Sequence, residues 1–221
     1  MKIENVEVFG FMAALRGMRN PMESWSKTDT RHAILGDDLP WNFTLVESSE
    51  LPMIGPNDMR LALSLIKAGG AHRKFLRQII VWWDITIPRA VWQELDTYKV
   101  ATVRNSCSTM HKLGSRDLEA CDFEGGEIAP TQLVLINELG AKYRSEKTPT
   151  NLHALKMQLP ESFLQKATYT FSYETALHMW FDRHDHRMPE WSGPEGICEW
   201  IKRLPYMPQF IECMLIEKAR G

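Results

Sequence analysis

A row of small polar side chains is the segment of this sequence best suited to chemistry. Within "DTYKVATVRNSCSTMHK", residues 96–112, hydroxyl and thiol groups follow one another at Ser106, Cys107, Ser108 and Thr109. Cationic side chains stand on both sides of the row, at Lys99, Arg104, His111 and Lys112. Serine or cysteine can attack a substrate when a base and an orienting acid lie within hydrogen-bond reach. Short hydroxyl side chains also cap helices, where backbone N–H groups bind anions. We favour a cap that binds an anion over a covalent nucleophile.

Two basic clusters are further candidates for anion binding. The first follows the pair Gly69-Gly70 and consists of His72, Arg73, Lys74 and Arg77. It could hold a phosphate or diphosphate, or it could be a solvated charged turn. The second consists of Arg183, His184, His186 and Arg187. Two histidines without a carboxylate or thiol at ligand spacing do not predict a metal site, whereas an arginine here suits a phosphate or the edge of a pyrimidine.

Composition excludes several broad classes of protein. The 221 residues are 44% hydrophobic and 24% charged, with a formal net charge of −2, so a general electrostatic binder of nucleic acid is not expected. No apolar run approaches the roughly 20 residues that span a bilayer, and the amino terminus lacks the order of a signal peptide. The four cysteines are too far apart for a zinc knuckle. We expect a cytoplasmic protein with free thiols, no metal and no membrane segment.

Periodicity predicts the elements that would position these residues. Alternation in 3–8 predicts a strand with a short helix near Gly10, and residues 16–30 are expected to be a loop. A helix is predicted from an N-cap at Asn57 to Gly69-Gly70. The β-branched and aromatic run predicts a strand at 79–87, with a helix beginning at Pro88. Long helices are predicted at 129–146 and 173–186, and two shorter ones in 194–220, broken at Pro205 and Pro208. The chain should be one α+β domain, 1–221, richer in helix than in strand.

Three segments resemble the flavin-dependent thymidylate synthases: "HRKFLR" at 72–77, "ITIPRAVWQELDTYKVATVRNSCSTMHK" at 85–112 and "FSYETALHMWFDRHDHRMPEW" at 171–191. The resemblance implies their fold, a helix-rich α+β structure with a central antiparallel sheet. The family signature is RHRxxSxNExSxR. Its second half falls on 105–110, where Asn105 and Ser108 match. Ser106 and Met110 replace the glutamate and the final arginine.

In the family, the second half of this signature contacts the pyrimidine nucleotide. The nucleotide-binding residues that the resemblance implies are Gln93, Asn105, Ser106, Cys107, Ser108, His111 and Arg183. Ser108 and Arg183 are the catalytic candidates, acting by positioning and by stabilising charge on the pyrimidine. The family mechanism needs no protein nucleophile, so Cys107 is expected to be a spectator.

The flavin-binding half of the signature is less well preserved. RHR falls on Thr97, Tyr98 and Lys99 if one residue is inserted before Asn105. The C-terminal family pattern, NxRxxxNxxxxR, falls on Ser172, Glu174, His178 and Arg183. A glutamate in place of a cation would repel the flavin diphosphate, so other cations must replace it. The implied cofactor-binding residues are His72, Lys74, Arg77, Tyr98, Lys99, Ser172 and His178.

The resemblance implies a methyltransferase of nucleotide biosynthesis. A one-carbon unit would pass from a reduced folate, methylenetetrahydrofolate, to C5 of a pyrimidine deoxynucleotide such as dUMP. FAD would supply hydride, and NADPH is the candidate reductant. The family assembles as a homotetramer with active sites between subunits. Two alternatives remain open: a related enzyme that makes a hydroxymethyl nucleotide, and a non-catalytic nucleotide-binding homologue that has lost flavin. Direct binding to nucleic acid is not expected.

Overall fold

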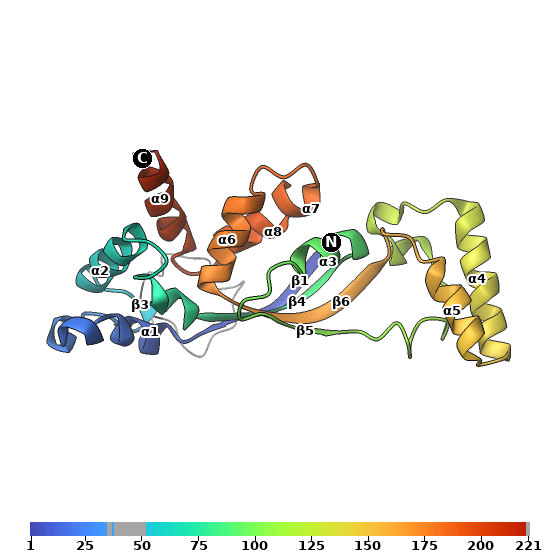
Figure 1. Ribbon diagram of the computed structural model, residues 1–221, viewed down its shortest axis with the longest axis horizontal. Helices are drawn as coiled ribbons and strands as arrows, with labels where there is room; N and C mark the ends of the chain where they lie inside the picture. Colours follow the sequence, from blue (N-terminus) through green and yellow to red (C-terminus); the bar gives the residue numbers. More distant parts are fainter. Residues whose placement is uncertain (35–36, 38–51, 220–221) are drawn as a thin grey trace. The chain divides into compact units, whose positions relative to one another are not determined.

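A computed structural model describes residues 1–34, 37 and 52–219 of the chain (Figure 1). The strands are β1 (Lys2–Phe9), β2 (Arg31–His32), β3 (Pro52–Met53), β4 (Ile80–Pro88), β5 (Val103–Ser106) and β6 (Leu164–Ser172). The helices are α1 (Phe11–Met18), α2 (Pro56–Lys67), α3 (Arg89–Leu95), α4 (Pro130–Ser145), α5 (Pro149–Met157), α6 (Tyr173–Arg183), α7 (Pro189–Ser192), α8 (Ile197–Lys202) and α9 (Met207–Lys218). Short 3-10 turns lie at Asn20–Met22, Trp25–Lys27, Lys74–Arg77, Ala120–Asp122 and Glu124–Gly126.

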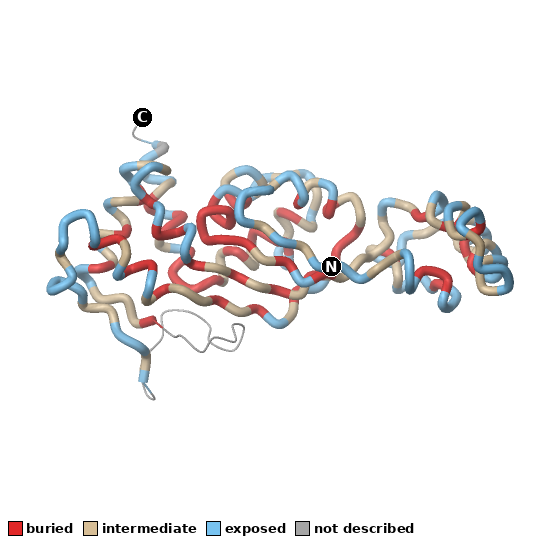
Figure 2. The backbone as a smooth tube through the Cα atoms, turned by 60° about the horizontal axis from the view of Figure 1, so that its bottom comes forward, coloured by how far each residue is buried: buried red, intermediate tan, exposed pale blue. Residues whose placement is uncertain are grey.

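The central sheet is antiparallel, with the strand order β1-β4-β6-β5. Along β4, residues alternate between half-buried and buried as far as Ile87. Figure 2 colours the backbone by the burial of each residue. The buried set is Val81, Trp83, Ile85 and Ile87, each fully shielded from solvent. This alternation is the period of two that places every second side chain on one face of a sheet. A separate pair, β2 and β3, is also antiparallel, with Arg31 opposite Met53.

The chain packs as two compact units, and β1, β4, β5 and β6 each contribute residues to both. The first unit consists of residues 1–4, 84–98 and 104–169. In it, α4 and α5 lie side by side (Figure 1). Their apolar faces close over a core of Leu113, Leu118, Phe123, Ile136, Leu155 and Leu159. The core thus fixes one end of the segment that follows β5.

The second unit consists, in its described part, of residues 5–34, 37, 52–83, 99–103 and 170–219. Large aromatic side chains dominate its core, and the rings of Trp83 and Phe171 lie 4.5 Å apart. Asp58 is fully buried, and its carboxylate accepts hydrogen bonds from Arg19 Nε and from the hydroxyls of Thr28 and Thr30, each at 2.6 Å. A buried carboxylate with this many donors fastens the 28–30 segment to α2.

Most of the predicted elements are confirmed, with four corrections. The helix predicted to begin at Pro88 is α3, but it begins at Arg89, and Pro88 ends β4 and is the N-cap of the helix. The helix predicted from Asn57 is α2, but it begins at Pro56 with Gly55 as N-cap, because proline suits the first turn. The expected loop at 16–30 begins inside α1. Pro208 does not break a helix, since it lies in the first turn of α9, where its missing N–H costs no hydrogen bond. Residue 220, the predicted end of that helix, lies outside the described residues.

The helix-rich α+β fold with a central antiparallel sheet is confirmed. The organisation of 1–221 as one domain stays a prediction.

Candidate functional site

The polar row begins where β5 ends. Ser108 Oγ accepts hydrogen bonds from the backbone N–H groups of Met110, at 3.2 Å, and His111, at 3.3 Å. The N–H of Lys112 donates to the Ser108 carbonyl at 3.1 Å, which closes a single helical turn. Ser108 therefore caps one turn rather than a full helix. Its oxygen is used as an acceptor, so its own hydrogen remains available to a ligand.

One backbone group and one side-chain group of β6 fix the peptide of Cys107. Its N–H donates to the Lys166 carbonyl at 2.8 Å, and its carbonyl accepts from Gln165 Nε2 at 2.9 Å. The amide oxygen of Gln165 accepts in turn from Arg104 Nη2 at 2.7 Å. The Arg104 guanidinium stacks over Trp92, 3.9 Å from the ring centroid, which is a cation–π contact. Hydrogen bonds from β6 thus hold the start of the polar row.

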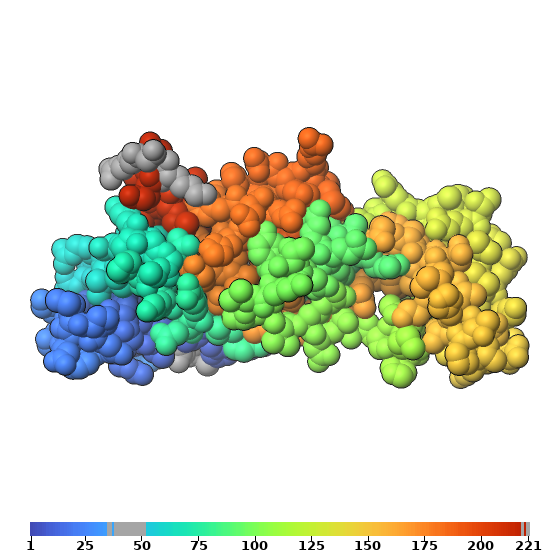
Figure 3. Space-filling view, in the orientation of Figure 1, coloured from blue at the N-terminus to red at the C-terminus, as the bar shows by residue number. Residues whose placement is uncertain are grey.

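A pocket of about 270 Å³ opens beside this turn. Its polar lining comes from Cys107, Ser108, Thr109, Lys112, Ser115, Arg116, Asp122, Gln165 and Lys166, and its floor is apolar, with Leu113, Leu118, Phe163 and Leu164. Figure 3 shows the segment after β5, in light green, at the molecular surface. Of the three cations that line the pocket, Arg116 pairs with Asp122, and Lys166 pairs with Asp84 and Glu4. Lys112 is exposed and is the cation best placed to contact an anion.

The other nucleotide-binding candidates divide between the two units. Gln93 is exposed on α3, where its amide donates to Glu161 at 3.0 Å. Asn105 and Ser106 are exposed on β5, and His111 is exposed in the capped turn. All of these, with Cys107 and Ser108, belong to the first unit, and only Arg183 of the predicted set belongs to the second.

Arg183 is half-buried at the C-terminal end of α6. One guanidinium nitrogen lies 3.0 Å from His186 Nε2, and the guanidinium carbon lies 5.2 Å from the Trp191 ring centroid. The nearby Cys198 is buried, which raises the pKa of its thiol to about 12 and keeps it protonated. Contacts to His186 and Trp191 hold the Arg183 side chain in a defined orientation.

The first basic cluster adjoins a larger pocket, of about 580 Å³, in the second unit. Its apolar lining includes Met18, Pro21, Met22, Leu61, Leu65 and Phe75, and its polar lining is Asn20, Ser24, His72, Lys74 and Gln78. His72 and Lys74, both exposed, are the predicted cofactor-binding residues that the structure brings to one cavity. Arg77 faces elsewhere, since its guanidinium donates to the Gly70 carbonyl at 3.1 Å.

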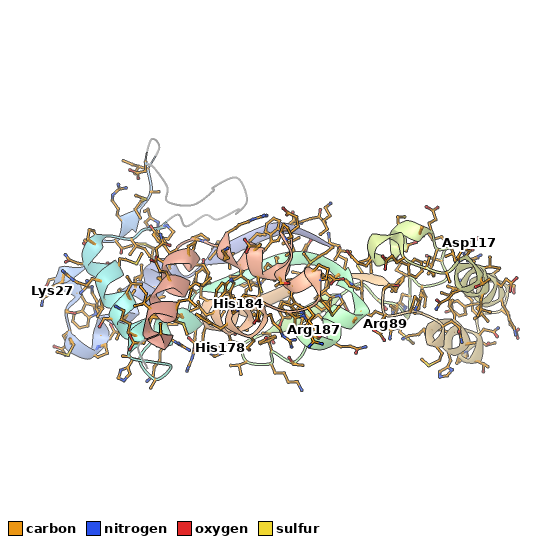
Figure 4. The ribbon with its side chains drawn as sticks, turned by 90° about the horizontal axis from the view of Figure 1, so that it is seen from above. Lys27, Arg89, Asp117, His178, His184 and Arg187 are labelled. Atoms are coloured by element: carbon orange, nitrogen blue, oxygen red, sulfur yellow. The ribbon has the colours of Figure 1, made fainter. Side chains whose placement is uncertain are left out.

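Arg73 and Glu174 form a buried ion pair that the sequence analysis did not anticipate. Arg73 Nε donates to both carboxylate oxygens of Glu174 at 3.0 Å, and the two side chains are 11% and 8% exposed. His178, labelled in Figure 4, is about half exposed, and its Nε2 lies 3.3 Å from Glu174 Oε1 and 3.1 Å from Arg73 Nη2. Burial alone would raise the pKa of Glu174, but His178 and Arg73 outweigh it and lower that pKa. The charge of Glu174 is therefore matched by a cation within the protein.

The remaining cofactor candidates are scattered. Ser172 is 1% exposed, and its hydroxyl caps α6 by accepting from the Thr175 N–H at 3.2 Å, so we do not propose it further as a ligand contact. Tyr98 is half-buried in the first unit, whereas Lys99 is exposed in the second. Neither Tyr98 nor Lys99 lines the pockets described above.

Sequence reasoning missed three residues that line the smaller pocket. Arg116, Gln165 and Lys166 line the smaller pocket, yet they lie outside the family motifs. Arg116 could have been suspected from Asp122, six residues later, whose carboxylate it contacts with both terminal nitrogens. Gln165 carried no local signal, because its partner Cys107 is 58 residues away.

The described part of the chain contains neither a metal-binding cluster nor a membrane-spanning helix. Within residues 1–34, 37 and 52–219, no three His, Cys, Asp or Glu side chains gather as ligands for a metal ion. Among the described helices, none has the length and hydropathy required to cross a membrane.

Comparison with known proteins identifies the fold. No family model and no curated protein sequence matches this chain. Two solved structures of the flavin-dependent thymidylate synthase ThyX from Helicobacter pylori, each with FAD and dUMP, are similar in structure. One has a TM-score of 0.65 at 13% sequence identity, covering 96% of this chain and 99% of that one. The other has a TM-score of 0.63 at 14% identity, covering 97% and 99%. The chain thus has the fold that the sequence predicted.

Proposed function

We propose that this protein transfers a one-carbon unit from a reduced folate to C5 of a pyrimidine deoxynucleotide, with FAD as cofactor. The observation that carries the proposal is the fold shared over almost the full length with ThyX of Helicobacter pylori, whose structures hold FAD and dUMP. Fold alone does not determine chemistry. Two local features support it: a cationic pocket beside the motif-matching turn, and a larger pocket beside the basic cluster.

We propose the capped turn of the first unit as a contact for the nucleotide, and Arg183 of the second unit as a separate candidate contact. The Ser108 hydroxyl can donate to an acceptor on the ligand, and Asn105 presents an amide from β5. Arg183 would stabilise negative charge on the pyrimidine as C5 becomes nucleophilic, because a guanidinium offers two parallel donors to a carbonyl edge or a phosphate. Cys107 is fixed by its backbone, and the proposal assigns its thiol no covalent step.

The residues around the larger pocket fit a flavin. A volume of about 580 Å³ lies within the range of ligand pockets, roughly 300–1,000 Å³, and apolar side chains suit a planar ring system. Lys74 can supply positive charge to a diphosphate, and the His72 ring can donate a hydrogen bond to it. Glu174 does not counteract them, because Arg73 pairs with it. A bound flavin supplies hydride; the protein's part is to bind it, orient it and exclude water.

Purified protein provides the first test of this proposal. We expect flavin absorbance in the protein as isolated, or after incubation with FAD, and we expect dUMP to bind by titration calorimetry. Mass spectrometry of the product would separate a methyl from a hydroxymethyl group at C5. Protein that binds dUMP but never FAD would contradict the proposal and favour the non-catalytic homologue.

The assembly and the reductant belong to the same proposal. We propose a homotetramer with active sites between subunits, and NADPH as the reductant, in the cytoplasm. Light scattering coupled to size-exclusion chromatography tests the assembly. A monomer at micromolar concentration would contradict it.

A further inference from the structure

We infer that His186 is the positioning residue of Arg183, and that it acts through the lone pair of its Nε2 nitrogen. The inference rests on the proposed function, in which Arg183 contacts the pyrimidine nucleotide. It adds a residue beyond the family pattern at the C-terminal end, since that pattern ends at Arg183. His186 determines how far Arg183 is oriented before a nucleotide arrives.

The ring of His186 lies between two hydrogen-bond donors. Arg183 Nη1 lies 3.0 Å from Nε2, and the backbone nitrogen of Met188 lies 3.2 Å from Nδ1, toward which its N–H points. A neutral imidazole has one lone-pair nitrogen and one N–H, so it accepts from only one of these donors. A protonated ring accepts from neither. Arg183 and Met188 therefore compete for one lone pair.

Distance and charge both favour Arg183 in this competition. Its contact with the ring is the shorter of the two, and a donor that carries charge forms hydrogen bonds roughly twice as strong as a neutral donor does. The guanidinium carbon also lies 5.2 Å from the ring centroid of Trp191, which is fully buried. Neutral His186 with its proton on Nδ1 is thus the form that holds Arg183.

His186 is itself fixed in place by other contacts. Its backbone N–H donates to the Arg183 carbonyl at 3.0 Å, and its carbonyl accepts from Ser192 Oγ at 2.6 Å. Its ring meets the Trp191 ring edge-on, with 6.3 Å between the centroids and 66° between the planes. A side chain that orients another must be held by its own surroundings, and His186 meets this requirement.

Orientation of Arg183 before binding raises affinity. A guanidinium carries five N–H donors in one plane, so a contact at Nη1 also fixes the direction of the others. Ordering a long side chain during binding costs entropy, and the contact with His186 removes part of that cost in advance. We expect this to raise nucleotide affinity roughly two- to tenfold, the usual range for one ordered side chain.

Two substitutions separate the roles of the two ring nitrogens. The amide oxygen of glutamine is as many bonds from Cβ as Nε2 is, so His186→Gln keeps an acceptor for Arg183. The amide oxygen of asparagine matches Nδ1 in the same way, so His186→Asn keeps an acceptor only for Met188. His32→Asn is the control, at an exposed histidine of β2 in the same unit.

Calorimetry with dUMP gives the first reading, and melting temperatures check the fold of each variant. We expect His186→Gln and the control to bind dUMP as the wild type does, and His186→Asn to bind it roughly two- to tenfold more weakly. In an Arg183→Ala background, His186→Asn should have no further effect, because the interaction between the two side chains is already removed. A purely structural role for His186 predicts the reverse order of the two variants, since only asparagine keeps the contact with Met188.

A second reading needs no nucleotide. In protein that contains isotope-labelled arginine, a guanidinium held by a hydrogen bond rotates slowly and gives resolved Nη–H signals in NMR spectra. The signals of Arg183 are assigned by their absence from Arg183→Ala. They should be present in the wild type and in His186→Gln, and they should be lost in His186→Asn.

Three results would overturn the inference. They are a wild-type affinity for dUMP in His186→Asn, a greater loss of affinity in His186→Gln than in His186→Asn, and Arg183 signals that survive in His186→Asn. A different pattern separates this inference from the proposed function. If the NMR signals follow the expected order but the wild type does not bind dUMP, the proposed nucleotide is wrong and the positioning of Arg183 by His186 stands.

Discussion

Replacement of Glu174 by glutamine should lower the free energy of unfolding by about 3 kcal/mol. The carboxylate is 8% exposed and accepts twice from Arg73 Nε at 3.0 Å. Glutamine keeps the shape and one acceptor oxygen but leaves the buried guanidinium charge unpaired. Removal of one partner from a buried pair costs about 3–5 kcal/mol. We expect the lower end, because His178 and Met214 remain in contact with Arg73.

Urea unfolding followed by tryptophan fluorescence would measure this loss. Glu195→Gln is the matched control, since Glu195 pairs with Arg203 at 3.3 Å on the surface and its side chain is 78% exposed. Surface pairs contribute about 0–1 kcal/mol, so the control should lose less than 1 kcal/mol. Equal losses in the two variants would refute the reasoning that burial makes the Arg73–Glu174 pair important.

The same pair predicts a pH dependence. Burial raises the pKa of Glu174, but its partners lower it below the ordinary value of 4.5. The carboxylate thus releases its proton more readily in the folded than in the unfolded chain, so its contribution is complete above about pH 4.5 and is lost as the pH falls through the folded-state pKa. The difference in stability between wild type and Glu174→Gln should therefore be larger at about pH 5 than at about pH 3. A constant difference down to about pH 3 would contradict the assignment.

Three further predictions concern the nucleotide site and the backbone. Arg183→Ala should weaken dUMP binding by about 1.5–3 kcal/mol in calorimetry, as expected for a hydrogen bond to a charged group; unchanged affinity for both dUMP and dCMP would refute its placement. Cys107→Ser should retain turnover, whereas Ser108→Ala should lose nucleotide affinity; the reverse pattern would favour a covalent cysteine. Ala101→Gly should raise stability by roughly 1 kcal/mol in urea unfolding, because φ is 56° at this alanine, a left-handed conformation that costs an L-residue about 1–2 kcal/mol; a lower midpoint would contradict this.

The spacing of apolar residues was enough to predict β4, α4 and α6. The apolar alternation of β4 and the three- and four-residue spacing in α4 and α6 predicted each element within a few residues. β6 was missed because Gln165, Lys166 and Thr168 interrupt its apolar positions. This segment is a strand because it pairs with β4 and β5. The amino-acid composition of 164–172 does not indicate that pairing.

The same division applies to the site: residues with a local signal were predicted, and residues defined by distant partners were missed. Ser108 was found from its place in a motif and from the capping preference of serine. The Arg73–Glu174 pair joins residues 101 positions apart, so the sequence alone suggested an isolated, repulsive glutamate. The structure shows that glutamate paired with a cation. Lys112 was visible in the sequence, but only the structure shows that it lines one pocket with Arg116 and Lys166.

Release of tritium from dUMP labelled at C5 tests the central claim most directly. The assay would combine the protein with FAD, methylenetetrahydrofolate and NADPH, and would follow both tritium in water and the modified nucleotide. The proposal predicts release that requires the folate and matches, mole for mole, a nucleotide with one added carbon at C5. Protein that holds both FAD and dUMP yet releases no tritium would contradict it.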